Sequence, residues 1–174
     1  RQANSERTVL QANALRASDS SFHGLDLALH AGELYGLYGL VGSGQNALCQ
    51  ALAGLLPAYG SIDLDGCELA PLSPEQRAAA GLAYVPGDRR AQGMLYALNV
   101  GENIALGSEG SGWIHRREEA QRVARIMDQL QVRAHSTAQP VGQLSGGNQQ
   151  KVLLGRGLLR TPHVLIARSE EHTS

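Results

Sequence analysis

The chain has 174 residues, of which 43% are apolar and 18% are charged, so it can bury a core and is predicted to be one folded domain, which excludes low-complexity disorder. Fifteen Lys and Arg against sixteen Asp and Glu give a net charge of −1, and no basic stretch would neutralise a phosphate backbone, so nucleic acid is excluded as the main partner. Cys49 and Cys67 are too few for a disulfide scaffold or a four-ligand zinc site, and they favour a reducing, cytosolic setting.

The two ends of the chain are expected to lie outside the fold. Residues 1–8 are polar and begin without a charged-then-apolar leader, so we interpret them as a linker remnant. Residues 168–174 read RSEEHTS, which looks like the translation of a common sequencing adapter, so we expect a non-native tail there. Residues 34–62 lack charge, but their glycines and Pro57 argue against a membrane span.

The first half of the chain predicts alternating strands and helices. Short apolar runs at 9–14 and 25–29 predict strands, and ELYGLYGL at 33–40 predicts a strand that runs into a glycine loop. Apolar residues at helical spacing predict a helix over 46–56. The alternation of SIDLDG predicts a further strand over 61–66.

The second half begins with a short helix opened by Ser73, with Gln76 three residues on, and then a buried strand at 82–85. From Val100 the pattern is helical, with an amphipathic helix predicted over 116–130. A helix over about 148–159 and a strand over 164–167 follow. This order predicts an α/β core with an inserted helical subdomain at about 98–145.

The loop Gly39–Asn46 reads GLVGSGQN and carries the two glycines of the phosphate-binding pattern GxxxxGK[ST]. The pattern fails at its last two positions, where Gln45 replaces the lysine and Asn46 replaces the hydroxyl residue. Gln and Asn can form hydrogen bonds but bring no charge. The sequence of this loop alone is compatible with two interpretations, a nucleotide-binding loop and a structural tight turn.

A dinucleotide-binding alternative uses the same stretch. Gly42, Gly44 and Ala47 fit GxGxxG/A, and Asp63 follows about 20 residues on, where an acid that binds the ribose belongs. This alternative leaves the residues after 80 unexplained.

A second glycine segment, LSGGNQQKV at Leu144–Val152, stands just ahead of a predicted helix and could bind an anion through backbone N–H groups and the helix dipole. It closely resembles the signature motif of ABC-type ATPases, in the form found in the second ATPase half of ribose, xylose and galactose importers. AGELYGLYGLVGSGQNAL, SPEQRAAAGLAYVPGDRRAQGM and NVGENIAL resemble other segments of that half in family order. The resemblance covers about residues 9–167.

The resemblance implies a truncated P-loop ABC-type domain with an antiparallel β subdomain, at the cytoplasmic face of a bacterial membrane. Its partners would be the first ATPase half of the same polypeptide, membrane permease subunits and, indirectly, a periplasmic or extracellular sugar-binding protein. Its cofactors would be ATP and Mg²⁺ in the assembled pair, and the fragment alone would be inactive. The resemblance assigns no catalytic residue or metal ligand to this fragment, and it assigns three groups of contact residues: a degenerate phosphate loop (Gly39, Leu40, Val41, Gly42, Ser43, Gly44, Gln45, Asn46), the signature that meets the partner half's ATP (Leu144, Ser145, Gly146, Gly147, Asn148, Gln149) and the Q-loop region (Pro86, Gly87, Asp88).

The chain departs from the family pattern at several positions. Gly87 stands where the family usually has Glu or Gln, and Arg168 with Ser169 replaces the expected acidic pair. Glu170 and Glu171 lie in the suspected adapter, so neither is taken as a catalytic base. Single residues that could have functional or packing roles are, in chain order, Phe22 as an adenine-stacking candidate, Tyr96 and Trp113 in the helical part, and the histidines His163 and His172.

The leading hypothesis is therefore the degenerate second half of a sugar-importer ATPase. Three alternatives stay open: a nucleoside importer ATPase half, a dinucleotide-dependent oxidoreductase domain, and a regulatory domain that binds no nucleotide.

Overall fold

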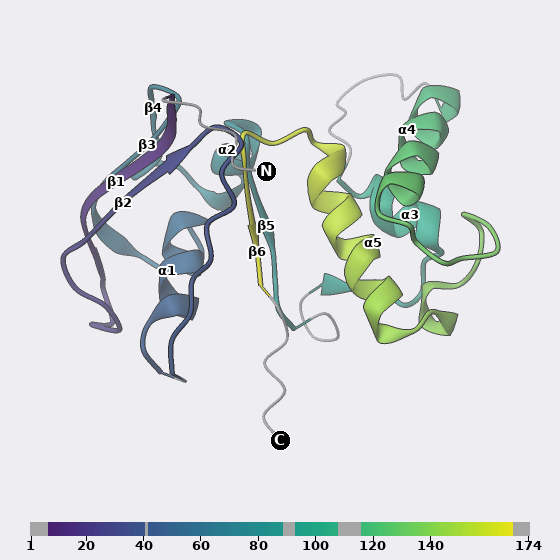
Figure 1. The fold of residues 1–174 in the computed structure, drawn as a ribbon, viewed down its shortest axis with the longest axis horizontal. Helices are drawn as coiled ribbons and strands as arrows, with labels where there is room; N and C mark the ends of the chain where they lie inside the picture. Colours follow the sequence, from purple (N-terminus) through teal and green to yellow (C-terminus); the bar gives the residue numbers. More distant parts are fainter. Residues whose placement is uncertain (1–6, 41, 89–92, 108–115, 169–174) are drawn as a thin grey trace. The chain divides into compact units, whose positions relative to one another are not determined.

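The computed structural model describes residues 7–40, 42–88, 93–107 and 116–168. The chain divides into two compact units, Arg1–Leu82 and Ala83–Ser174, and each unit has its own arrangement of strands and helices (Figure 1). The boundary falls ahead of the helical segment expected at 98–145.

The first unit is built on an antiparallel sheet with the strand order β2-β1-β3-β4. Strand β1 lies between β2 and β3, with Leu10 opposite Leu29 on one side and Leu64 on the other. Leu10 and Leu64 are buried, as are Leu15 and Ile62, so alternate residues of these strands form the core face. The antiparallel subdomain is confirmed, and its strands are β1 (Thr8–Ala17), β2 (Leu25–His30), β3 (Ala58–Leu64) and β4 (Cys67–Glu68).

Two short helices complete this unit: α1 (Gln45–Leu52) and α2 (Pro74–Ala79). The predicted capping box of α2 is present, since Ser73 Oγ accepts from the Gln76 N–H and the Gln76 side chain accepts from the Ser73 N–H. Arg77 of α2 is only 6% exposed. Its guanidinium donates to the carbonyls of Ala51 and Leu52 at the end of α1, so one buried side chain joins the two helices.

The strand predicted at Glu33–Leu40 is wrong in this structure. Those residues form no strand or helix, and five apolar side chains among them are exposed, with Leu34 at 99% and Tyr38 at 97%. A strand exists only where a neighbouring backbone pairs with it, and among the described residues no strand of the antiparallel sheet pairs with this segment. We call these side chains the apolar strip: Leu34, Tyr35, Leu37, Tyr38 and Leu40.

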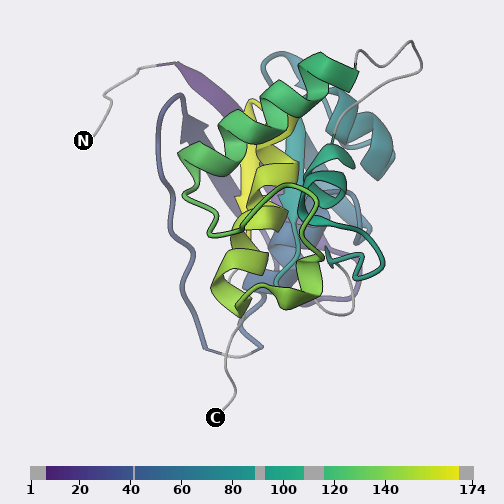
Figure 2. The same cartoon turned by 90° about the vertical axis from the view of Figure 1, so that its right-hand side faces the viewer.

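The second unit combines a strand pair with helices. Strand β5 (Leu82–Val85) pairs with β6 (Val164–Ala167), and the Arg168 N–H extends the ladder by donating to the Val85 carbonyl. The helices pack around a core that includes Val100, Ile104 and Val152, and both views show them side by side (Figure 1 and Figure 2). They are α3 (Val100–Ala105), α4 (Arg116–Gln129), the 3₁₀ turn η2 (Val141–Gln143) and α5 (Gly146–Leu159).

Helix α5 begins two residues earlier than predicted, because Gly146 and Gly147 are helical and Ser145 is the N-cap residue. Glycine weakens a helix interior, so the sequence pattern placed the start after the pair. None of the helices in the described ranges is long and apolar enough to cross a membrane.

Candidate functional site

The N-terminus of α5 presents the LSGGN segment. Ser145 is exposed and its side chain caps no N–H of the helix, so the first turn keeps its donors for a ligand. In the described part of the chain, nothing lies within 4 Å of where a Cβ would project from Gly147. A helix of 14 residues with an uncapped first turn and open space at a glycine suits an anionic group.

Asn148 links this turn to the segment that runs past it. Its Oδ1 accepts from the Arg133 backbone N–H at 2.8 Å, and its Nδ2 donates to Ser145 Oγ at 3.0 Å. Asn148 therefore fixes both the N-cap residue and the neighbouring chain.

A hollow of about 360 Å³ lies beside Ser145. The histidine and arginine that line it, His135 and Arg133, come from the stretch ahead of η2, so two basic residues border the hollow beside the uncapped helix end. Its lining residues are Arg133, Ala134, His135, Gln139, Gln143, Leu144, Ser145 and Asn148.

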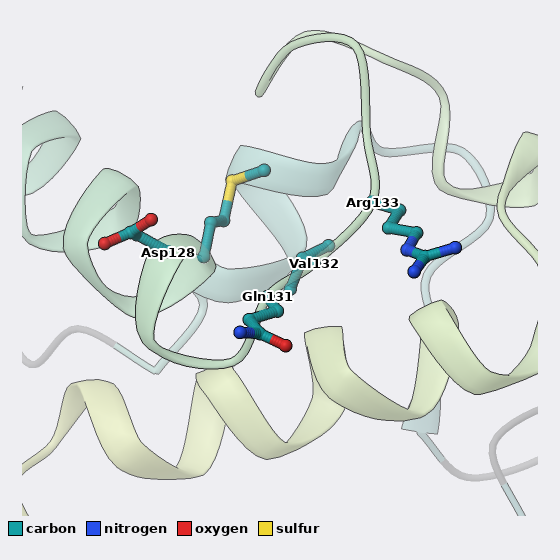
Figure 3. Close-up of a pocket in the computed structure, with 5 residues that line it drawn as sticks. Asp128, Gln131, Val132 and Arg133 are labelled. Carbon is teal, nitrogen blue, oxygen red and sulfur yellow. The ribbon is translucent and has the colours of Figure 1, made fainter.

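Arg133 also lines a second hollow, of about 500 Å³, beyond the end of α4. Figure 3 shows its side chain pointing away from Asp128, with Gln131 and Val132 between them. The guanidinium is thus directed away from the nearest acidic residue of this hollow. Arg133 and His135 were not singled out from the sequence; two basic residues some ten positions ahead of LSGGN were the available signal.

Two other residues assigned to the signature lie inside the unit. Leu144 is buried in the helical core. Gln149 is 8% exposed, and its amide nitrogen Nε2 donates to the carbonyls of Val141 and Leu144. The Tyr96 hydroxyl lies 3.5 Å from Gln149 Oε1. In this arrangement Gln149 supports η2 and is not directed at a ligand.

The phosphate loop in the first unit is closed by its own side chains. Gln45 Nε2 donates to the Leu40 carbonyl at 3.2 Å and to the Gly39 carbonyl at 3.4 Å, and Ser43 Oγ donates to Gln45 Oε1 at 2.5 Å. Gln45 stands where the phosphate-binding lysine belongs, and its hydrogen bonds are used within the loop. Asn46 is exposed at the first turn of α1, and Val41 lies outside the described residues.

Gly44 allows the sharp entry into α1, with φ of +90°. A Cβ at this position would come within 2.5 Å of the Ser21 carbonyl oxygen and 3.2 Å of Phe22 Cβ, so only glycine fits. Phe22 therefore packs against the loop. This contact agrees with the packing role considered for it, and it also places an aromatic residue next to the phosphate loop.

The Q-loop region supplies no ligand for a metal ion at residue 87. Gly87 is buried and lacks a side chain, Pro86 is partly buried, and Asp88 is exposed. Within the described ranges, no three His, Cys, Asp or Glu side chains gather as a metal site. With Asn46 in place of a hydroxyl residue, the loop of this chain does not fit Mg²⁺. Trp113, Ser169, Glu170, Glu171 and His172 lie outside the described residues.

The dinucleotide-binding alternative is wrong, because it requires a strand that runs directly into the glycine loop and pairs side by side with a parallel strand that follows the helix. Residues 33–40, ahead of the loop, form no strand, and β3, the strand after α1, pairs antiparallel with β1 and β4. Asp63 instead accepts from the Gly66 N–H in the β3–β4 turn.

Residues 22–167 match the sequence family described as ABC transporter, and the chain belongs to that family.

Among curated proteins, the chain is 39% identical to the ribose import ATP-binding protein RbsA 1 of Agrobacterium fabrum over 152 residues, which cover 84% of the chain and 30% of that protein. It is 41% identical to the galactofuranose transporter ATP-binding protein YtfR of Escherichia coli K12 over 146 residues, 81% of the chain and 29% of that protein. The chain thus spans less than a third of the length of either relative.

Solved structures show the same fold. The ATP-binding cassette MJ0796 bound to ADP and Pi superposes with a TM-score of 0.78 at 18% identity, over 91% of this chain and 72% of that one. The cassette MJ1267 of an ABC transporter gives 0.77 at 20% identity, over 91% and 68%. The α/β fold class of an ABC-type ATPase domain is therefore confirmed.

Proposed function

We propose that this chain is part of the second, degenerate nucleotide-binding half of a bacterial sugar-import ATPase. In this proposal it contributes its signature segment to an ATP bound by the first half. The observation that carries the proposal is a contrast between two glycine segments: the N-terminus of α5 is uncapped and open at Gly147, whereas the phosphate loop is closed by Gln45.

The signature residues have the chemistry for this contribution. The Ser145 hydroxyl and the first N–H groups of α5 would donate to phosphate oxygens, and the dipole of a 14-residue helix favours negative charge at that end. Bound between two halves, ATP would supply the free energy for closure and transport. Mg²⁺ would be held by the first half, since the residues of this chain do not fit it.

The relatives support the sugar class. Two proteins with 39% and 41% identity are named for ribose import and galactofuranose transport. From these names we infer that the assembled protein works with membrane permease subunits at the cytoplasmic face, and that the sugar is delivered by a binding protein. The nucleoside-importer alternative remains the second candidate within the same family.

The deciding experiment reads the source DNA outward from both ends of this sequence and then assays ATP hydrolysis. We expect a first domain with a lysine-bearing loop upstream of residue 1, and an acidic pair after residue 167 in place of RSEEHTS. The purified 174-residue chain should show no ATP turnover, whereas the complete polypeptide should. Turnover by the isolated chain, or a gene that encodes only these residues, would overturn the proposal.

A further inference from the structure

The hydroxyl of Ser145 is held in a defined orientation by a neighbour on its own helix. Asn148 lies three residues further along α5, and its amide nitrogen is 3.0 Å from Ser145 Oγ. This contact decides whether the Ser145 hydroxyl gives or receives a hydrogen bond.

The orientation of the Asn148 amide is determined by its other partner. A backbone N–H can only donate, so the atom of Asn148 that lies 2.8 Å from the Arg133 nitrogen must be the oxygen Oδ1. The NH₂ group therefore faces Ser145. Since an NH₂ group can only donate, Ser145 Oγ must accept.

A serine hydroxyl has one proton and two acceptor positions. When Asn148 fills one acceptor position, the Ser145 proton must point elsewhere. Ser145 is exposed beside the 360 Å³ hollow, so its proton is available to an acceptor that enters the hollow from outside the helix turn. A phosphate oxygen is such an acceptor.

From this geometry we infer that Asn148 is a positioning residue, which sets the Ser145 hydroxyl as a donor to phosphate and does not itself contact the nucleotide. The inference rests on the proposed function, and it changes the role assigned to Asn148 from contact to positioning. Both side-chain functions of Asn148 are used within the unit, one on Arg133 and one on Ser145. The bond from Arg133 to Asn148 holds the backbone at Arg133, a residue that lines the hollow.

The test is a double-mutant cycle on ATP hydrolysis by the complete polypeptide, with Ser145→Ala, Asn148→Ala and the two combined. A charge-assisted hydrogen bond from Ser145 predicts that Ser145→Ala lowers kcat roughly 10- to 100-fold. Asn148→Ala should also lower kcat, by a smaller factor than Ser145→Ala does. In a protein that already carries Ser145→Ala, it should have little further effect on kcat. KM for ATP should change less than kcat in each variant.

Asn148→Leu repeats the cycle with a side chain of similar size, in case Asn148→Ala leaves the helix unfolded. Gln129→Ala, on the exposed side of α4, is the control and should keep wild-type activity. Circular dichroism of each variant verifies the fold.

The outcomes separate the two proposals. If Ser145→Ala leaves hydrolysis unchanged, the signature role in the proposed function fails and the inference fails with it. If Ser145→Ala lowers kcat and the fold-loss in the double variant equals the product of the two single fold-losses, the proposed function stands and the positioning role is overturned. Non-additive losses for both Asn148 variants support the inference.

Discussion

The guanidinium of Arg156 on α5 donates hydrogen bonds to both oxygen atoms of Asn103 on α3. Its Nε donates to the Asn103 carbonyl and its Nη2 donates to Asn103 Oδ1, each at 2.8 Å. Asn103 is fully buried and exchanges hydrogen bonds with both the N–H and the carbonyl of Leu95. Burial lowers the pKa of the Arg156 guanidinium, yet these partners compensate its desolvation. The pair therefore ties two helices and the chain at Leu95 together.

We expect Asn103→Ala to lower the free energy of unfolding by about 3–5 kcal/mol, because it leaves Arg156 Nη2 and the N–H and carbonyl of Leu95 without the Asn103 side chain, while the bond from Arg156 Nε to the backbone carbonyl at residue 103 remains. Urea unfolding followed by circular dichroism measures the change. Gln121→Ala, at an exposed position of α4, should stay within about 0.5 kcal/mol of the wild type. An equal loss in both variants would contradict the role of the pair.

The phosphate loop should gain affinity when its missing groups are restored. Gln45→Lys with Asn46→Thr removes the amide that bonds to Leu40 and Gly39 and supplies an ammonium and a hydroxyl. We expect binding of a fluorescent ATP analogue in the presence of Mg²⁺ to tighten by about 10- to 100-fold.

The matched control for this change is Gln50→Lys, which adds the same charge on α1 away from the loop and should bind like the wild type. Identical affinities for the restored loop and the wild type would show that closure by Gln45 is not what limits binding.

Ser145→Arg should abolish sugar uptake in cells that carry the complete polypeptide. The substitution places a long cation where the proposed function puts a phosphate contact, and it fills the hollow beside Asn148. ATP hydrolysis by the purified protein should fall at least about 100-fold, as for the loss of a transition-state donor. Gln129→Arg carries the same charge on α4 and should leave uptake intact. Normal uptake with Arg at position 145 would rule out the signature role.

The stability that Glu75 contributes should depend on pH. Its own backbone N–H and then the Ser73 hydroxyl donate to its carboxylate and lower its pKa. A carboxyl whose pKa is lower in the folded state stabilises the fold above its unfolded pKa, and that stabilisation is lost as pH falls through the folded pKa. Glu75→Gln should therefore be less stable than the wild type at pH 7, and the difference should shrink below the ordinary glutamate pKa of about 4.3 and vanish as the pH falls through the lowered pKa of the folded state.

Thermal unfolding of both proteins between pH 3 and pH 7 measures this convergence. A difference that stays constant over the whole range would show that the charge of Glu75 has no part in capping α2.

The apolar strip should make the isolated chain self-associate. Leu34 and Tyr38 are almost completely exposed, and unpaired backbone beside apolar side chains invites pairing with another chain. We expect Leu34→Lys with Tyr38→Lys to reduce the weight-average mass in sedimentation at micromolar concentration, together with the binding of an apolar dye. Leu106→Lys, at an exposed residue of the second unit, should change neither. A wild-type chain that is monomeric under these conditions would contradict the prediction.

Local patterns predicted most of the secondary structure. The capping box at Ser73 was found where it was expected, because a cap depends on residues that are close in sequence. The strand at Leu82–Val85 was also found where it was expected, and there the distant partner strand β6 is present. The strand expected at 33–40 did not form. Its apolar pattern is a local property, whereas a strand also needs hydrogen bonds to a backbone that is distant in sequence.

The sequence by itself determined the family, since LSGGN and the degenerate GLVGSGQN loop are contiguous segments that can be compared directly. Only the tertiary structure decided what individual side chains do. Asn148 faces Arg133, 15 residues away, and Arg156 faces Asn103, 53 residues away. The burial of Gln149 and the inward bonds of Gln45 likewise follow from where their partners lie in space. A hydrogen bond forms only at a suitable distance and angle between donor and acceptor, and the order of residues in the sequence does not give either quantity.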